Sequence, residues 1–185
     1  MIDEIRADAD ERMGKSVENL HTAFARIRTG RANPSLLDGI EVPYYGTDTP
    51  LNQVASVTVE DARTLVISPW EKKMVPEIEK AILKSDLGLT PNSTSELIRV
   101  PLPALTEENR RDLAKQARHE AENARIAIRN IRRDAIGDVR DLVKEKEVAE
   151  DEAHRAEEAI QKLTDKRIGE VDKALEAKEA DLMAF

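Results

Sequence analysis

Apolar residues recur every three or four positions in three long segments of the chain, which is the pattern of an amphipathic helix. The segments cover residues 1–28, 106–146 and about 148–183. Gly30 follows the first segment where a helix C-cap would lie, and Thr106 precedes the second in the position of an N-cap. None of these helices can bury its apolar stripe alone. We therefore predict that the three helices pack together as a bundle.

The residues between the first two helices follow a different pattern, with apolar side chains alternating from Ile40 onward. This alternation is typical of β-strands, and four strand candidates start near residues 40, 54, 64 and 97. Residues 46–50 and 92–94 are expected to form turns, and 75–85 a short helix. Trp70 is expected to be a core or hinge-facing aromatic. The segment predicts a small α+β unit.

These elements predict an α+β protein in which an elongated three-helix bundle carries an inserted β/α/β domain. Residues 1–29 and 106–185 would form the bundle, and residues 31–104 the inserted domain. Two connections near 29–34 and 101–106 would then lie together as a two-stranded hinge. The hinge residues that we single out are Thr29, Gly30, Arg31, Pro101, Pro103 and Leu105.

Composition removes several classes of function. The 185 residues include no cysteine, which excludes disulfides, thiolate metal sites and a cysteine nucleophile. The three histidines are scattered, and no nucleophile–base pair is identifiable, so we expect no enzyme, no cofactor and no metal site. No apolar run approaches the length of a membrane span, and the acidic N-terminus lacks the apolar stretch of a signal peptide. We expect a cytoplasmic protein that binds neither a membrane nor a small-molecule substrate.

Charge is distributed unevenly along the chain. The net charge of −8 argues against a general nucleic-acid binder. Residues 105–146 nevertheless carry eleven basic and nine acidic side chains, while residues 147–185 carry six and twelve. The second helix is therefore the one positive segment, and we expect the acidic third helix to face away from any nucleic acid.

Arginines gather on one face of the second helix. On a helical wheel, with about 100° per residue, six arginines fall within about 60° of Arg111. The acidic residues of the helix lie outside this sector. The six are Arg118, Arg125, Arg129, Arg132, Arg133 and Arg140. The planar guanidinium fork matches phosphate, and a row of forks along a rod suits an RNA backbone read by its shape. The alternative is a solvated helix face in which Glu122 pairs with Arg125 and Arg118.

Several motifs together resemble the bacterial ribosome recycling factor family. The resemblance starts in the signature Arg28-Thr29-Gly30-Arg31-Ala32 and continues through Ile98-Arg99-Val100-Pro101-Leu102-Pro103. It also includes Ile128-Arg129-Asn130-Ile131-Arg132-Arg133-Asp134-Ala135 on the second helix. It extends over essentially the whole chain, and the joint occurrence of these motifs is far more specific than any one of them.

The resemblance implies an L-shaped molecule of two domains that separates ribosomal subunits after termination, together with elongation factor G and GTP. It implies that the bundle binds large-subunit ribosomal RNA. Arg129 and Arg132, which the helical wheel also selects, match the RNA-contacting arginines of the family. Arg110 matches another, although the wheel places it about 100° from Arg111 on the apolar side. We expect a monomer, and the alternative is a structural protein that self-associates through its coiled-coil stripes.

Overall fold

The computed structural model describes residues 1–184, and Phe185, the last residue of the predicted bundle domain, lies outside them. Contacts within the chain divide it into two compact units. The first unit comprises Met1–Phe24 and Ala114–Ala180, and the second comprises Ala25–Leu113 with the end of the chain from Asp181. The three boundaries between the units therefore fall inside helices, and the first two lie several residues from the connections near 29–34 and 101–106.

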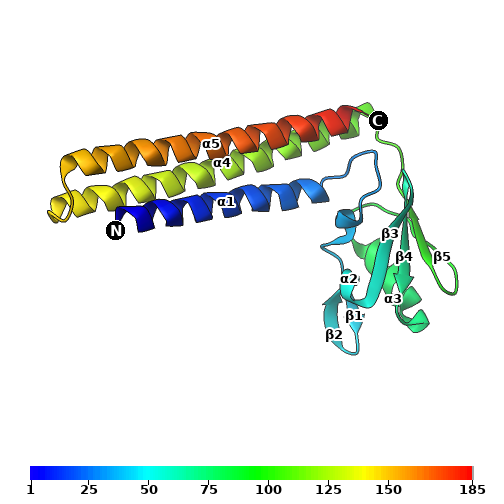
Figure 1. The fold of residues 1–185 in the computed structure, drawn as a ribbon. Coiled ribbons are helices and arrows are strands. Elements are labelled where there is room, and N and C mark those ends of the chain that lie inside the picture. The colour runs from blue at the N-terminus through cyan, green and yellow to red at the C-terminus, as the bar shows by residue number, and fades with distance from the viewer. Residues whose placement is uncertain (185) are drawn as a thin grey trace. The chain divides into compact units, whose positions relative to one another are not determined.

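Three long helices make up the first unit: α1 (Ile2–Arg26), α4 (Glu107–Lys144) and α5 (Glu150–Met183). The predicted helices are confirmed to within a few residues at each end. Figure 1 shows the helices lying side by side, with α4 and α5 antiparallel across a short turn. Thr106 is confirmed as the N-cap of α4, because its hydroxyl accepts a hydrogen bond from the backbone N–H of Asn109 at 3.1 Å.

The bundle core combines alanines with larger aliphatic side chains on all three helices. Ala117, Ala121 and Ile128 of α4 are fully buried, as are Met13 of α1 and Ile160 of α5. Small residues allow the helix backbones to approach closely, and the aliphatic side chains fill the space between them. The apolar stripes are thus buried within a single chain, as the bundle prediction requires.

An arginine of α5 crosses to α1 over a glycine. The Arg167 guanidinium donates to Asp10 at 2.6 Å and to Glu170 at 3.0 Å. A Cβ atom on Gly14 would lie 3.3 Å from the nearer guanidinium nitrogen, so the absent side chain makes room for this contact. Hydrogen bonding with Asp10 raises the pKa of Arg167. The contact fixes α1 against α5.

The second unit contains a four-stranded antiparallel sheet in the order β3-β4-β6-β5. Its strands are β3 (Ala55–Asp61), β4 (Thr64–Pro69), β5 (Asn92–Ser93) and β6 (Ile98–Pro101). Helix α3 (Val75–Lys84) packs against the core, where its side chains join those of the two central strands. The fully buried residues of this core include Leu65, Ile67, Ile78, Ile98 and Val100.

A separate hairpin pairs β1 (Glu41–Tyr44) with β2 (Thr47–Pro50). Two short helical segments, η1 (Pro34–Leu37) and α2 (Leu51–Val54), flank the hairpin. The expectation that residues 46–50 form a turn is wrong for most of that stretch. The turn is only Tyr45-Gly46, both with positive φ angles (49° and 82°), and the chain pairs again from Thr47.

Two further expectations for this unit need correction. Asn92–Ser93 is a short strand that pairs with β6, and the turn begins at Thr94, whose hydroxyl accepts from the backbone N–H of Leu97. Trp70 is not a core residue, because 65% of it is exposed. It follows the end of β4, its backbone N–H donates to the carbonyl oxygen of Val54, and it lines a small pocket together with Pro34 and Leu37.

Across residues 1–184, no helix is both long enough and apolar enough to cross a membrane. The same residues contain no group of three or more histidine, aspartate or glutamate side chains placed to hold a metal ion.

Candidate nucleic-acid interface

The eight arginines of α4 differ in what they contact. Three of the predicted RNA-binding arginines lie seven residues apart, at positions 118, 125 and 132. Their guanidinium groups reach Glu179, Asp172 and Gln161 of α5. A seven-residue spacing beside an apolar stripe is typical of ion pairs that border a coiled-coil seam. This part of the row therefore holds α4 and α5 together.

The acidic third helix contributes directly to this seam. Arg118 donates to Glu179 at 2.8 Å, and Arg140 donates to Glu157 at 3.0 Å. The expectation that the acidic third helix faces away from nucleic acid stays a prediction, but these carboxylates of α5 do face the arginines. They lie beside the arginine row and neutralise part of it.

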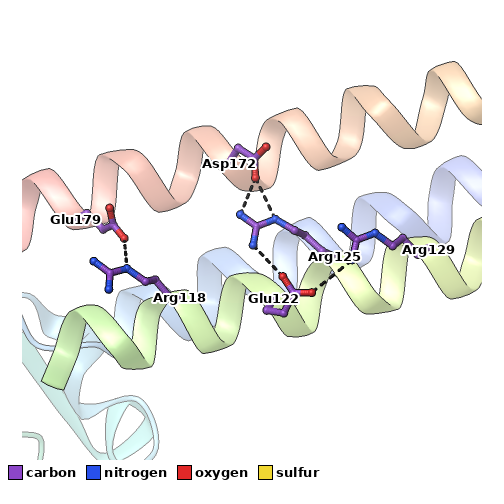
Figure 2. Close-up of polar contacts among 6 residues, drawn as sticks. All are labelled: Arg118, Glu122, Arg125, Arg129, Asp172 and Glu179. Carbon is purple, nitrogen blue, oxygen red and sulfur yellow. Dashed lines mark hydrogen bonds and ion pairs between the residues drawn. The ribbon is translucent and has the colours of Figure 1, made fainter. Parts of the chain in front are cut away.

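Arg125 is the most heavily committed of these side chains. Its Nε and Nη2 atoms donate to one oxygen of Asp172 at 3.0 and 2.7 Å, and its Nη1 donates to Glu122 at 3.1 Å (Figure 2). Only 19% of the side chain is exposed. The hydrogen bond with Asp172 raises the pKa of Arg125 despite the opposing effect of burial. All three nitrogens of Arg125 thus already donate to carboxylates of the chain.

Arg129 and Arg133 make fewer contacts with the rest of the chain, although the side chains of Arg118 and Arg140 are more exposed (62% and 68%). The Arg129 side chain is 44% exposed and makes one contact, at 3.4 Å, with the second oxygen of Glu122. Arg133 is exposed and makes no hydrogen bond or ion pair within residues 1–184. The two side chains are one helical turn apart and lie on the same face. Their guanidinium groups therefore keep most of their donors for a phosphate from solvent.

Arg110 and Arg132 have structural contacts of their own. Arg110 Nη1 donates to the carbonyl oxygen of Met183 at 3.2 Å, so its charge lies at the C-terminus of α5. The last turn of α5 has no basic residue of its own. A cation at a helix C-terminus stabilises the exposed carbonyl groups, and Arg110 supplies that charge. Arg132 is partly buried and makes a long contact of 3.4 Å with Gln161.

The sequence did not reveal the carboxylates that hold the arginines, apart from Glu122. The predicted pair of Glu122 with Arg125 is confirmed, whereas Arg118 pairs with Glu179 and Glu122 takes Arg129 as its second partner. The acidic charge of residues 147–185 was the sequence signal for carboxylates that could pair with the arginines. It could not show which carboxylates reach α4, because that depends on how α5 lies along α4.

The predicted hinge residues lie in two segments with little regular structure. Thr29 accepts a hydrogen bond from the backbone N–H of Arg31 at 3.3 Å, and Gly30 is buried between them. Pro101 ends β6, while Pro103 and Leu105 lie in the irregular segment before α4.

Arg28, at the start of the same signature, is unusual. Its Nε and Nη2 atoms are buried and have no hydrogen-bond partner among the described residues. Burial lowers the pKa of Arg28, because a low-dielectric environment disfavours the charged form.

Comparison with known proteins decides the family. The family model described as "Ribosome recycling factor" matches residues 20–183, which include the whole arginine row. The chain belongs to the ribosome recycling factor family. The ribosome-recycling factor of Saccharophagus degradans is 63% identical over 183 residues, which cover 99% of each chain. That of Hahella chejuensis is 62% identical over 184 residues, which cover 100% of each.

Solved structures of ribosome recycling factors share this fold. A solution structure of a ribosome recycling factor matches with a TM-score of 0.79 and 40% identity, covering 100% of this chain and 98% of that one. A second structure matches with a TM-score of 0.69 and 46% identity, covering 99% of both chains. It presents the T. thermophilus ribosome recycling factor and the E. coli elongation factor G bound to the E. coli post-termination complex.

Proposed function

We propose that this ribosome recycling factor splits post-termination ribosomes in the cytoplasm as a monomer, together with elongation factor G and GTP. The bundle binds large-subunit ribosomal RNA through arginines of α4. The observation that carries this is the pair of exposed arginines, Arg129 and Arg133, in a row of guanidinium groups on a rigid helix. Guanidinium forks match phosphate, and a row of them along a rod suits an RNA backbone that is recognised by its shape.

The role of the protein in this reaction is mechanical and not enzymatic. The elongation factor hydrolyses GTP, and the segments near 29–34 and 101–106 act as the hinge through which the small domain moves relative to the bundle. A structure neighbour with elongation factor G on the post-termination complex supports this choice of partner. Within the row we assign direct RNA contacts to Arg129, Arg132 and Arg133. We assign supporting positions to Arg110, Arg118 and Arg125, because each donates to α5 at 3.2 Å or less, whereas the contact of Arg132 with Gln161 is long, at 3.4 Å.

The self-associating coiled coil is the weaker alternative. It requires an apolar stripe that is open to a second chain. The stripe of α4 is instead covered by its own neighbours, with Ala117, Ala121 and Ile128 fully buried.

Splitting of post-termination ribosomes, followed on a sucrose gradient with elongation factor G and GTP, tests this function. The test variant combines Arg129→Glu with Arg133→Glu. The matched control combines Lys162→Glu with Lys166→Glu, two exposed cations of α5 with the same four-residue spacing. Both doubles change the net charge equally, and circular dichroism checks that both fold.

We expect the wild type and the lysine control to release subunits and the arginine double to lose at least 90% of the rate. Equal activity of both doubles would show that RNA contacts lie elsewhere. Failure of the wild type itself would contradict the recycling function of this chain.

A further inference from the structure

Glu122 places a negative charge inside the row of arginines. One oxygen of its carboxylate accepts from Arg125 at 3.1 Å, and the other accepts from Arg129 at 3.4 Å (Figure 2). The Glu122 side chain is 49% exposed, so it lies on the surface that the arginines present. Two oxygens that bridge two guanidinium groups resemble the arrangement a phosphate would make.

The two arginines that Glu122 bridges are not equivalent. Arg125 is also held at two nitrogens by Asp172, so it stays in place if Glu122 is withdrawn. Arg129 has no other contact in the described part of the chain, and 3.4 Å lies at the long end of the hydrogen-bond range. An incoming phosphate would therefore displace Glu122 from Arg129 and leave Arg125 where it is.

We propose that Glu122 is a positioning and specificity-determining residue that occupies the phosphate site of Arg129 in the free protein. This inference rests on the proposed RNA-binding function. An RNA must supply a phosphate that replaces the carboxylate, and it must tolerate the remaining negative charge nearby. Only an RNA whose folded backbone also meets other arginines, such as Arg133, gains enough contacts to do so. Glu122 therefore disfavours generic RNA more than the ribosomal site.

The substitution Glu122→Gln tests this role, because glutamine keeps the shape and one acceptor oxygen but removes the charge. Asp138→Asn is the matched control. Asp138 is an exposed residue of the same helix, about 160° away around its axis, and it contacts no cation within residues 1–184. Both changes raise the net charge by one unit, so any difference between them is local.

The measurement is equilibrium binding to two probes over a salt series: a 20-base-pair RNA duplex of arbitrary sequence and purified large ribosomal subunits. We expect Glu122→Gln to bind the duplex about tenfold more tightly than the wild type, with a slope of log K against log salt that is steeper by roughly 0.9. Binding to large subunits should change less than threefold. Asp138→Asn should behave as the wild type does on both probes.

A second variant separates this role from a merely structural one. In a chain that already carries Arg129→Gln, the Glu122→Gln change should lose most of its effect on duplex binding, because the guanidinium it would release is absent. Equal effects of Glu122→Gln and Asp138→Asn on the duplex, or an unchanged effect in the Arg129→Gln chain, would overturn the inference. A wild type that fails to bind large subunits would overturn the proposed function itself.

Discussion

Arg125 and Arg133 are eight positions apart on one helix and have opposite surroundings. At about 100° per residue they differ by about 80° around the helix axis. This turns Arg125 toward α5, where Asp172 accepts two of its hydrogen bonds while Glu122 of α4 accepts a third, and leaves Arg133 in solvent. Breaking the contacts of a partly buried charge is destabilising, because the charge is left without compensation. The same residue type therefore has a structural role at Arg125 and is free for the proposed RNA contact at Arg133.

Lys146 is strained at the turn between α4 and α5. Its φ angle is +58°, and the backbone N–H groups of Lys146 and Glu147 donate to Val143 and Leu142 as in a Schellman C-cap. A left-handed conformation costs an L-residue about 1–2 kcal/mol, whereas glycine adopts it freely. We expect Lys146→Gly to raise the free energy of unfolding by about 0.5–1 kcal/mol, measured by urea unfolding with circular dichroism.

Lys146→Ala is the control for this prediction. It removes the same charged side chain but keeps the Cβ atom, so it should bring no comparable gain. Equal stabilisation by both variants would attribute the effect to the lysine charge instead of the backbone.

At the scale of elements, the three glycines inside the long helices have different surroundings. A Cβ atom on Gly137 of α4 or Gly169 of α5 would meet nothing within 4 Å, but one on Gly14 of α1 would press on the Arg167 guanidinium. Alanine is better than glycine in a helix interior by about 0.8–1 kcal/mol. We expect Gly137→Ala and Gly169→Ala to stabilise the protein by nearly this amount, and Gly14→Ala to gain little or to destabilise it.

Urea unfolding followed at 222 nm compares the three glycine variants. Because Arg167 is held by Asp10 and Glu170, it cannot yield easily to a new methyl group. A Gly14→Ala variant as stable as the other two would show that this contact is loose.

The long helices could be predicted from the sequence because their signals are local. The three- and four-residue spacing of apolar side chains and the Thr106 cap are enough to place α4. The hairpin could not be predicted in the same way. Tyr45 has a left-handed backbone conformation, for which asparagine or glycine is the usual sequence signal. The two-residue turn was therefore not predicted, and the residues of β2 were assigned to a turn instead of a strand.

The candidate site was predictable only in part for a related reason. The position of an arginine on the wheel follows from its sequence number, and Arg129 and Arg133 are indeed exposed. The pairing of Arg118 with Glu179 and of Arg125 with Asp172 depends instead on how α5 lies along α4. Tertiary packing sets that alignment, and the spacing within either helix does not contain it.

At the scale of the whole molecule, the charge distribution fits the proposed binding to one RNA site better than binding to polyanions in general. The chain carries a net charge of −8, yet its exposed arginines are concentrated on α4. Long-range repulsion from the acidic remainder lowers the affinity for polyanions in general, while short-range guanidinium contacts favour a matching phosphate array. We infer that the protein needs several simultaneous contacts before it binds RNA.

The salt dependence of binding to purified large ribosomal subunits tests this account most directly, with Arg133→Ala compared with the wild type. Arg155→Ala, which removes an exposed arginine of α5, is the control. Each phosphate contact contributes about 0.7–0.9 to the slope of log K against log salt. The account predicts that Arg133→Ala reduces the slope by about this amount and weakens binding, while Arg155→Ala does neither. An unchanged slope for Arg133→Ala would contradict the claim that the exposed arginines of α4 bind ribosomal RNA.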